Sequence, residues 1–142
     1  MTSDNLENLA KIGQLKREPA AQAEVDGLVL SGRKRLKDAG NASNALESRF
    51  DLAYNAAHAL ALAALRWRGF RSESRYLVFQ VLPNTLGMSD AEWRVLALCH
   101  ERRNKAEYEG TLEVDERLLS ELIAMSGKLL RAVEKLGPMK AG

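Results

Sequence analysis

Apolar residues recur every three to four positions along most of this chain, and this spacing constrains its fold more than any other feature. Residues three and four apart share one side of an α-helix, whereas the alternation typical of a half-buried strand is absent over any useful length. The three prolines, Pro19, Pro83 and Pro138, all stand where a helix could begin or end. The pattern predicts an all-α fold, an up-and-down bundle of about five to six helices.

Start and stop signals divide the chain into six predicted helices. The clearest start is the capping box Ser89-Asp90-Ala91-Glu92, and Gly110 ends that helix. Asn44, with Glu47 three residues later, predicts a second start, and the apolar run before Pro83 is interpreted as a short helix rather than a strand. The predicted helices span 5–15, 19–39, 44–68, 76–82, 89–109 and 115–137.

The predicted helix over 44–68 is rich in alanine between Ala53 and Leu65. Small side chains let a neighbouring helix approach closely. This helix is therefore expected to be the centre of the bundle.

Length and composition favour one domain, residues 1–142, with 1–18 as an N-terminal extension and 138–142 as a tail. The single cysteine, Cys99, excludes an internal disulfide and is typical of a reducing compartment. No apolar stretch could span a membrane and no signal peptide is recognisable, so a cytoplasmic protein without a membrane partner is expected. Two histidines and one cysteine lack metal-ligand spacing, so neither a metal nor another cofactor is expected.

One face of the predicted helix over 89–109 changes from apolar to polar along its length. The apolar part comprises Trp93, Leu96 and Ala97, and the polar part comprises His100, Arg103, Asn104 and Glu107, with Tyr108 at its edge. Polar groups that face a core or an interface need hydrogen-bonding partners. The stripe therefore predicts a buried network, a dimer contact or a functional site, unless the helix simply emerges into solvent.

Arg103-Asn104-Lys105-Ala106-Glu107-Tyr108 late in a helix, together with the alanine-rich Tyr54–Leu60 and the turn Gly69-Phe70-Arg71, resembles the HEPN domain. The hallmark of that family is an arginine, usually followed by a polar residue, with a histidine four to six residues after the arginine. The close resemblance covers less than half of the chain, from about Phe50 to Tyr108. Tyr108 occupies the histidine position, so the motif here is an Arg-Asn-x-x-x-Tyr variant.

The resemblance implies a four-to-five-helix bundle in which two chains pair, so that both arginines and both motif histidines meet in a cleft. Many members of the family are metal-independent ribonucleases, and others are partners of nucleotidyltransferases or parts of toxin–antitoxin and defence systems. It therefore implies a homodimer that acts on or binds RNA or a nucleotide, as a toxin or defence component. The alternative is a non-catalytic dimeric interaction module that binds a protein such as a nucleotidyltransferase or an antitoxin.

The tyrosine in place of histidine favours phosphate binding over catalysis. Tyrosine has a pKa near 10 and is a poor base at pH 7, whereas an arginine can bind phosphate whatever replaces the histidine. His100, three residues before Arg103 on the same face, is a candidate replacement for the missing base. The candidate catalytic residues are Arg103, Asn104, Tyr108 and His100. We expect Glu107 to pair with Arg103 and His58 to pack in the core.

A net charge of only +2 requires any nucleic-acid contact to come from local positive charge. Arg102 and Lys105 flank the motif, and Arg68 and Arg71 stand among aromatic residues that could stack on bases. These four are the candidate nucleic-acid-binding residues. The alternative for the second pair, which the intervening Glu73 favours, is an aromatic turn with solvated arginines.

Overall fold

The computed structural model describes residues 2–139 and confirms an all-α helical bundle. Within these residues the helices are α1 (Thr2–Lys11), α2 (Gln22–Ala39), α3 (Leu46–Trp67), α4 (Arg75–Gln80), α5 (Leu82–Leu86), α6 (Asp90–Glu109) and α7 (Glu116–Glu134). The strands described are β1 (Lys16–Arg17) and β2 (Phe70–Arg71), which pair antiparallel. None of the described helices is long and apolar enough to cross a membrane.

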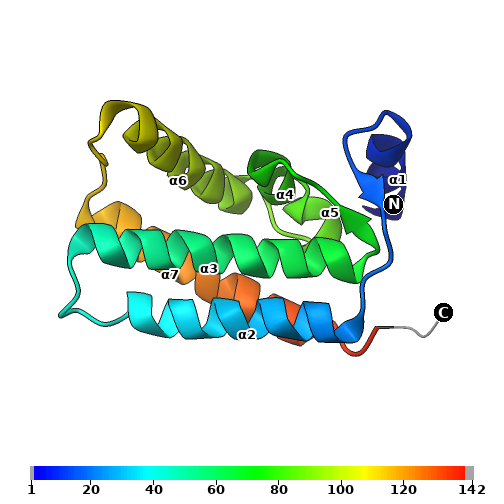
Figure 1. The fold of residues 1–142 in the computed structure, drawn as a ribbon, viewed down its shortest axis with the longest axis horizontal. Coiled ribbons are helices and arrows are strands. Elements are labelled where there is room, and N and C mark those ends of the chain that lie inside the picture. Colours follow the sequence, from blue (N-terminus) through cyan, green and yellow to red (C-terminus); the bar gives the residue numbers. More distant parts are fainter. Residues whose placement is uncertain (1, 140–142) are drawn as a thin grey trace.

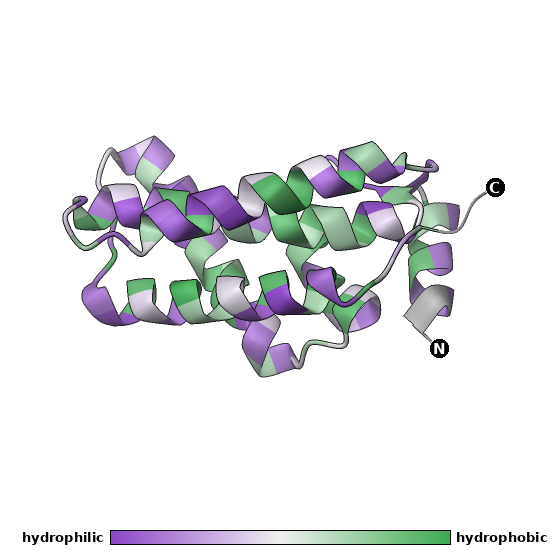
Figure 2. Cartoon of the chain, turned by 90° about the horizontal axis from the view of Figure 1, so that it is seen from below, coloured by the Kyte–Doolittle hydropathy of each residue, from purple (hydrophilic) through white to green (hydrophobic). Residues whose placement is uncertain are grey.

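The four long helices run in alternating directions, as Figure 1 shows for α2, α3, α6 and α7. The short helices α4 and α5 lie between α3 and α6 in the chain, and α1 packs against α5 at the same end of the bundle. Each long helix carries both hydrophobic and hydrophilic residues (Figure 2). Amphipathic helices of this kind bury one side against their neighbours and leave the other in water.

Helix α3 is the centre of the bundle, as its alanine content predicted, and it contacts α2, α6 and α7. Its small side chains are almost all buried: Ala53, Ala56, Ala57, Ala59, Ala61, Ala63 and Ala64. The closest approach is to α2, where a Cβ on Gly32 would lie 2.6 Å from Leu60 Cγ. On the other side, Ser126 Oγ of α7 donates a hydrogen bond to the Ala53 carbonyl at 3.2 Å.

The N-terminal segment is bound to the bundle by its own contacts. Leu6 of α1 is fully buried, and β1 pairs with β2 so that Lys16 lies opposite Arg71. Arg66 of α3 is 4% exposed and donates to Glu24 at 2.6 Å and to the Glu18 carbonyl at 2.8 Å. This buried guanidinium ties the segment before α2 to the centre of the fold.

The capping signals of α6 and α7 are confirmed. Ser89 and Glu92 form both bonds of the capping box, Gly110 ends α6 with a φ of 73°, and Asp115 caps α7. Two other boundary predictions are wrong. Asn44 does not cap α3, whose N-cap is Ala45. The Asn44 amide instead donates to the carbonyl of Asp38, in the last turn of α2, at 3.2 Å.

The second wrong boundary is at Pro83, which does not follow a helix but lies in the first turn of α5. A proline costs no hydrogen bond there, since the first turn has no intrahelical acceptor for its missing N–H. The chain bends at Val81 instead, and the apolar run divides between α4 and α5. The first helix also ends earlier than predicted, at Lys11, before Gly13 turns with a φ of 82°.

Candidate functional site

The polar part of the α6 stripe meets the bundle through His100 and Arg103, which are half-buried, whereas Asn104 and Glu107 are exposed. Trp93 and Leu96 are buried in the first half of the helix, and the same side then brings His100 and Arg103 to the hydroxyl and ring of Tyr54 on α3. The stripe thus forms a polar network with α3 at His100 and Arg103, and the last turns of the helix emerge into solvent. We call the group formed by Tyr54, Arg75, His100, Arg103 and Asn104 the His100 cluster.

Both ring nitrogens of His100 are hydrogen-bonded. Nδ1 lies 2.8 Å from Tyr54 Oη, and Nε2 lies 3.0 Å from Asn104 Nδ2. An amide nitrogen can only donate, so Nε2 accepts, and the proton of a neutral ring lies on Nδ1 and is donated to Tyr54 Oη. The phenol keeps its own hydrogen for another acceptor, and the imidazole is fixed in one tautomer and one orientation.

Arg103 is bound on three sides. Its Nε donates to Asp51 Oδ1 at 3.3 Å, its Nη1 donates to Glu107 Oε1 at 3.2 Å, and its guanidinium carbon lies 5.0 Å from the centre of the Tyr54 ring. The expected pair with Glu107 is therefore confirmed. The Arg103 side chain is 28% exposed, so the guanidinium is positioned by the protein and still open to a ligand.

Arg75, at the start of α4, supplies a second guanidinium to the same ring. Its Cζ lies 5.8 Å from the centre of Tyr54, and its Nη1 donates to Asn55 Oδ1 at 3.5 Å. No carboxylate lies within 4.0 Å of Arg75 among the described residues. Two cations thus meet at one aromatic side chain, and only one of them is paired with acids.

The electrostatic environment keeps both histidines neutral. Partial burial, and then Arg75 and Arg103, lower the pKa of His100 below its usual 6.5. Burial and the same cations lower the pKa of His58 to about 4, where its ring packs edge-on against Phe79 at 6.0 Å as expected. Burial raises the pKa of Tyr54 above its usual 10. A neutral imidazole can accept a proton, and perturbed groups of this kind gather at functional sites.

A pocket of about 500 Å³ opens beside the cluster on the outer side of α6. His100 and Asn104 form one part of its wall, and Tyr76 of α4 forms another. A ligand in this pocket would meet His100 and the Asn104 side chain that is hydrogen-bonded to its Nε2. The pocket therefore lies at the solvent-exposed edge of the His100 cluster.

Tyr108 stands apart from the other candidate catalytic residues. It is 91% exposed and makes no hydrogen bond with another described residue. Asn104 and Arg103 lie with His100, but Tyr108 is eight residues beyond His100, which turns it by about 80° around the helix. The phenol that reaches the histidine belongs to Tyr54 on another helix.

The other candidate residues on α6, Arg102 and Lys105, lie on a different side of the helix. Arg102 donates to the Glu113 carbonyl at 2.9 Å, and Lys105 Nζ lies 3.6 Å from Glu113 Oε1 and 4.0 Å from Glu109 Oε2. Both cations are therefore bound to the acidic loop before α7. The structure does not bring them to the His100 cluster.

Arg68 and Arg71 lie at the opposite end of α3. Arg68 stands 14 residues after Tyr54, which corresponds to about 21 Å along a helix, and its side chain rests on Trp67 and donates to the Thr85 carbonyl. Arg71 is paired with Glu18 at 3.4 Å. These contacts correspond to the aromatic turn with arginines that was the alternative interpretation.

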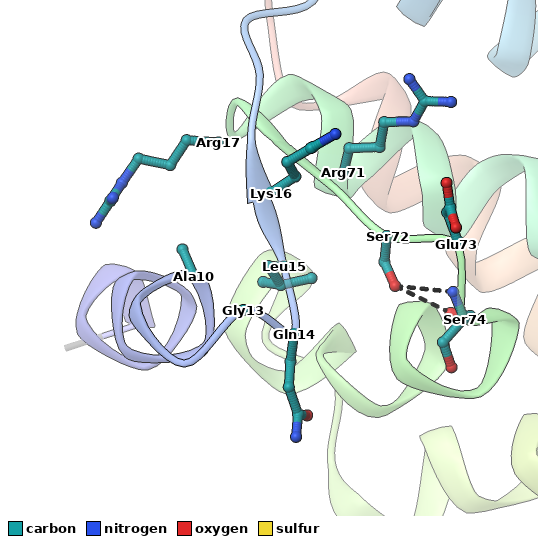
Figure 3. Close-up of a pocket in the computed structure, with 10 residues that line it drawn as sticks. All are labelled: Ala10, Gly13, Gln14, Leu15, Lys16, Arg17, Arg71, Ser72, Glu73 and Ser74. Carbon is teal, nitrogen blue, oxygen red and sulfur yellow. Dashed lines mark hydrogen bonds between the residues drawn. The ribbon is translucent and has the colours of Figure 1, made fainter.

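Arg71 also lines a pocket of about 690 Å³ between β1, β2 and the start of α4. Lys16 and Arg17 line it too, but Figure 3 shows the Arg17 side chain extending away from those of Lys16 and Arg71. Arg17 is paired with Glu7, and Arg71 with Glu18. The three cations do not converge on a common ligand position.

The described residues contain no group of three or more side chains that could hold a metal ion. Cys99 is fully buried, and burial raises the pKa of its thiol to about 12, so a reactive thiolate is not available at neutral pH. The chemistry of this region therefore rests on guanidinium, imidazole, phenol and amide groups.

Three members of this arrangement were not predicted as site residues: Tyr54, Asp51 and Arg75. Tyr54 belongs to the alanine-rich part of α3, and its ring is buried there. A buried tyrosine nevertheless needs a partner for its hydroxyl, and that requirement could have marked it.

Comparison with known proteins adds no relative. No protein-family model matches the chain, and neither a curated protein nor a solved structure matches it significantly.

Proposed function

We propose that this chain is an HEPN-like module that binds RNA through the His100 cluster. One observation carries the proposal: Arg75 and Arg103 meet at the ring of Tyr54, whose hydroxyl holds a neutral His100. Guanidinium groups are the side chains best suited to phosphate oxygens, and the buried Tyr54 ring holds the two of them close together. A phosphodiester at the cluster would meet two cations.

The same cluster contains a base for metal-independent cleavage. In that reaction a base takes the 2′-hydroxyl proton and the 2′-oxygen bonds to phosphorus. The bond from phosphorus to the 5′-oxygen then breaks, and the 5′-oxygen takes up a proton. His100 Nε2 is the accepting nitrogen, and a 2′-hydroxyl that replaced the Asn104 amide there would be placed for deprotonation. Arg103 would stabilise the charge that develops on the phosphate.

The test is cleavage of a labelled, structured RNA in EDTA by the purified protein, with Arg103→Ala and His100→Ala beside it. We expect each variant to lose cleavage by about 100-fold or more. Arg117→Ala is the matched control, since Arg117 is an exposed arginine on α7 whose one ion pair among the described residues is with Glu121. Equal cleavage by all four proteins would exclude the cluster as the site.

The pH dependence separates a base from a merely structural histidine. With the pKa of His100 below 6.5, the cleavage rate should rise with pH, have its midpoint below 6.5 and be level at pH 7. Protein that binds RNA in an Arg103-dependent way without cleaving it would support the binding function alone. No binding and no cleavage would contradict the proposal.

A second function, a non-catalytic interaction module for a protein such as a nucleotidyltransferase or an antitoxin, is favoured by Tyr108. An aromatic side chain that is 91% exposed is the type of residue that anchors protein interfaces. In that case Tyr108→Ala would abolish capture of the partner, and Arg103→Ala would not. RNA binding thus depends on Arg103 and the interaction module on Tyr108, so the two variants distinguish the two functions.

A further inference from the structure

The pocket beside the His100 cluster has an apolar stretch between two opposite charges. We call it the α6 pocket, and its volume is about 500 Å³. Ala97 and Leu98 line it between Arg94 and Glu101, which lie seven residues, or about 10 Å, apart along the helix. A flat ring with hydrogen-bond acceptors on one edge and donors on another is the kind of ligand that these surroundings match.

The two charges of the α6 pocket are available to a ligand. Arg94 and Glu101 are both exposed, and neither has an ion-pair partner within 4.0 Å among the described residues. Glu92, on the same helix, is by contrast paired with Lys128 of α7. A ligand at Arg94 and Glu101 would therefore have no existing ion pair to break.

Tyr76 of α4 gives the α6 pocket an aromatic wall. Its side chain is 43% exposed, and its ring lies edge-on to Trp93 with 6.1 Å between the ring centres. The centre of the His100 ring lies 6.2 Å away on another side. An exposed aromatic ring that its neighbours hold in place is a surface on which a nucleobase can stack.

We propose that the α6 pocket binds guanine, the base of the RNA nucleotide whose ribose lies at His100. The proposal rests on the proposed function of the same site. The O6 and N7 acceptors of guanine match the fork of an arginine, and its N1–H and N2–H donors match the two oxygens of a carboxylate. Adenine, cytosine and uracil each have an acceptor beside the donor, where a carboxylate needs a second donor.

The order of side chains around α6 agrees with the order of groups in a nucleotide. Steps of 100° per residue place four side chains about 20°, 80°, 120° and 180° around the helix from Arg94, in one direction: Glu101, Asn104, His100 and Arg103. The base would lie between Arg94 and Glu101. The ribose would then lie at Asn104 and His100, and the phosphate at Arg103.

This placement predicts cleavage on the 3′ side of guanosine. His100 would take the proton of the guanosine 2′-hydroxyl, and the 2′-oxygen would bond to phosphorus. The bond from phosphorus to the 5′-oxygen of the next nucleotide would break, and that oxygen would take a proton from water. The products would be one fragment that ends in guanosine 2′,3′-cyclic phosphate and one that begins with a 5′-hydroxyl.

The test is fluorescence anisotropy with four labelled oligouridines of one length, each with G, A, C or U at its central position. We expect the wild type to bind the G-containing RNA at least about fivefold more tightly than the other three. Glu101→Gln replaces an acceptor by a donor, so this preference should fall below about twofold. Glu109→Gln is the matched control, since Glu109 is an exposed glutamate of α6 outside the pocket, and the preference should persist.

The stacking surface has its own pair of variants. Tyr76→Leu removes the ring and should weaken binding of the G-containing RNA by about fivefold or more, whereas Tyr76→Phe keeps the ring and should bind as tightly as the wild type. If Tyr76→Leu bound this RNA as tightly as the wild type, the base would not stack in the α6 pocket and the proposal would be overturned.

The guanine preference and RNA binding fail separately. Arg103→Ala should weaken binding of all four RNAs and leave the guanine preference in place. Equal, Arg103-dependent affinities of the wild type for the four RNAs would overturn the guanine pocket and leave RNA binding standing.

Nucleoside 3′-monophosphates test the pocket when no RNA is bound. In an NMR titration, guanosine 3′-monophosphate should shift the backbone amide signals of Tyr76 and Glu101 at lower concentrations than the adenosine, cytidine and uridine 3′-monophosphates do. A protein with this preference and no affinity for RNA would keep the pocket and lose the proposed function. Equal responses to the four mononucleotides would overturn the pocket.

Discussion

Helices α3 and α6 have similar lengths but are held in the fold in different ways. α3 buries twelve of its 22 residues, mostly alanine and leucine, and has no side-chain cap at its start. α6 buries three of its 20 residues, begins with a complete capping box and meets α3 through hydrogen bonds and charged groups. α3 is held by close packing along most of its length, whereas α6 combines three buried residues, Trp93, Leu96 and Cys99, with polar contacts to α3.

This difference explains where a site can arise. Close packing leaves no room for a ligand, whereas a helix that contacts its neighbours through polar groups presents them at a cleft. The candidate site thus combines polar residues of α6, which is less buried, with Tyr54 of the closely packed helix α3.

The largest effect is expected at the packed helix. Leu60→Ala removes a fully buried side chain next to Gly32 and should lower the free energy of unfolding by about 2–5 kcal/mol. Leu30→Ala on α2, where the leucine is 45% exposed, should change it by less than about 1 kcal/mol. Urea denaturation measures both, and similar losses would contradict the packing account.

A smaller effect tests the contact between α2 and α3 directly. Gly32→Ala places a Cβ 2.6 Å from Leu60 Cγ and should cost about 1–3 kcal/mol of stability. Gly27→Ala on the same helix meets no atom within 4 Å and should stabilise by up to about 1 kcal/mol. If both substitutions changed the thermal midpoint in the same direction, the close approach would not be present in solution.

The packed helix α3 can also be tested by pH, because His58 on that helix is largely buried and titratable. The pKa of His58 falls from 6.5 in the unfolded chain to about 4 in the fold, so the unfolded chain binds more protons between these values. The contribution of His58 to the free energy of unfolding is therefore fully present above pH 6.5. It is lost as the pH falls toward 4, and the loss is about 2 kcal/mol after allowance for the partial exposure of the side chain. His58→Leu should remove this contribution, and an unchanged pH profile in that variant would refute it.

The smallest effect concerns the helix starts. Ser89→Ala removes the cap of α6 and should cost about 1 kcal/mol, whereas Ala45→Asp adds a cap to α3 and should stabilise by about 0.5–1 kcal/mol. Chemical denaturation measures the change in the free energy of unfolding for each variant, and so compares the capped helix α6 with the uncapped helix α3. A loss of stability in Ala45→Asp would show that other contacts of the segment around Ala45 matter more than the cap.

The helices could be predicted from the sequence because their signals are local. The capping box at Ser89, the glycine at 110 and the alanine-rich run after Ala53 each act within a few residues. Asn44 and Pro83 failed as markers because each suits two neighbouring positions, and the choice depends on packing. Asn44 bonds to the end of α2, and Pro83 fits the start of α5 as well as it would follow α4.

The candidate site was predictable only in the part that one helix carries. His100, Arg103 and Asn104 share a face by helical geometry, and the structure brings them together. Tyr54 and Arg75 come from α3 and α4, and nothing local in the sequence tells which of their neighbours they will meet. Tyr108 was grouped with the others by its motif position, but the rotation of α6 turns it to solvent.

The central claim, that the His100 cluster binds RNA, is tested most directly by fluorescence anisotropy of a labelled single-stranded RNA at fixed salt. The account predicts that Arg75→Ala and Arg103→Ala each raise the Kd by about tenfold or more, while Arg117→Ala leaves it unchanged. Circular dichroism of each variant confirms that the bundle remains folded. Equal affinities for all four proteins, or no binding by the wild type, would contradict the account.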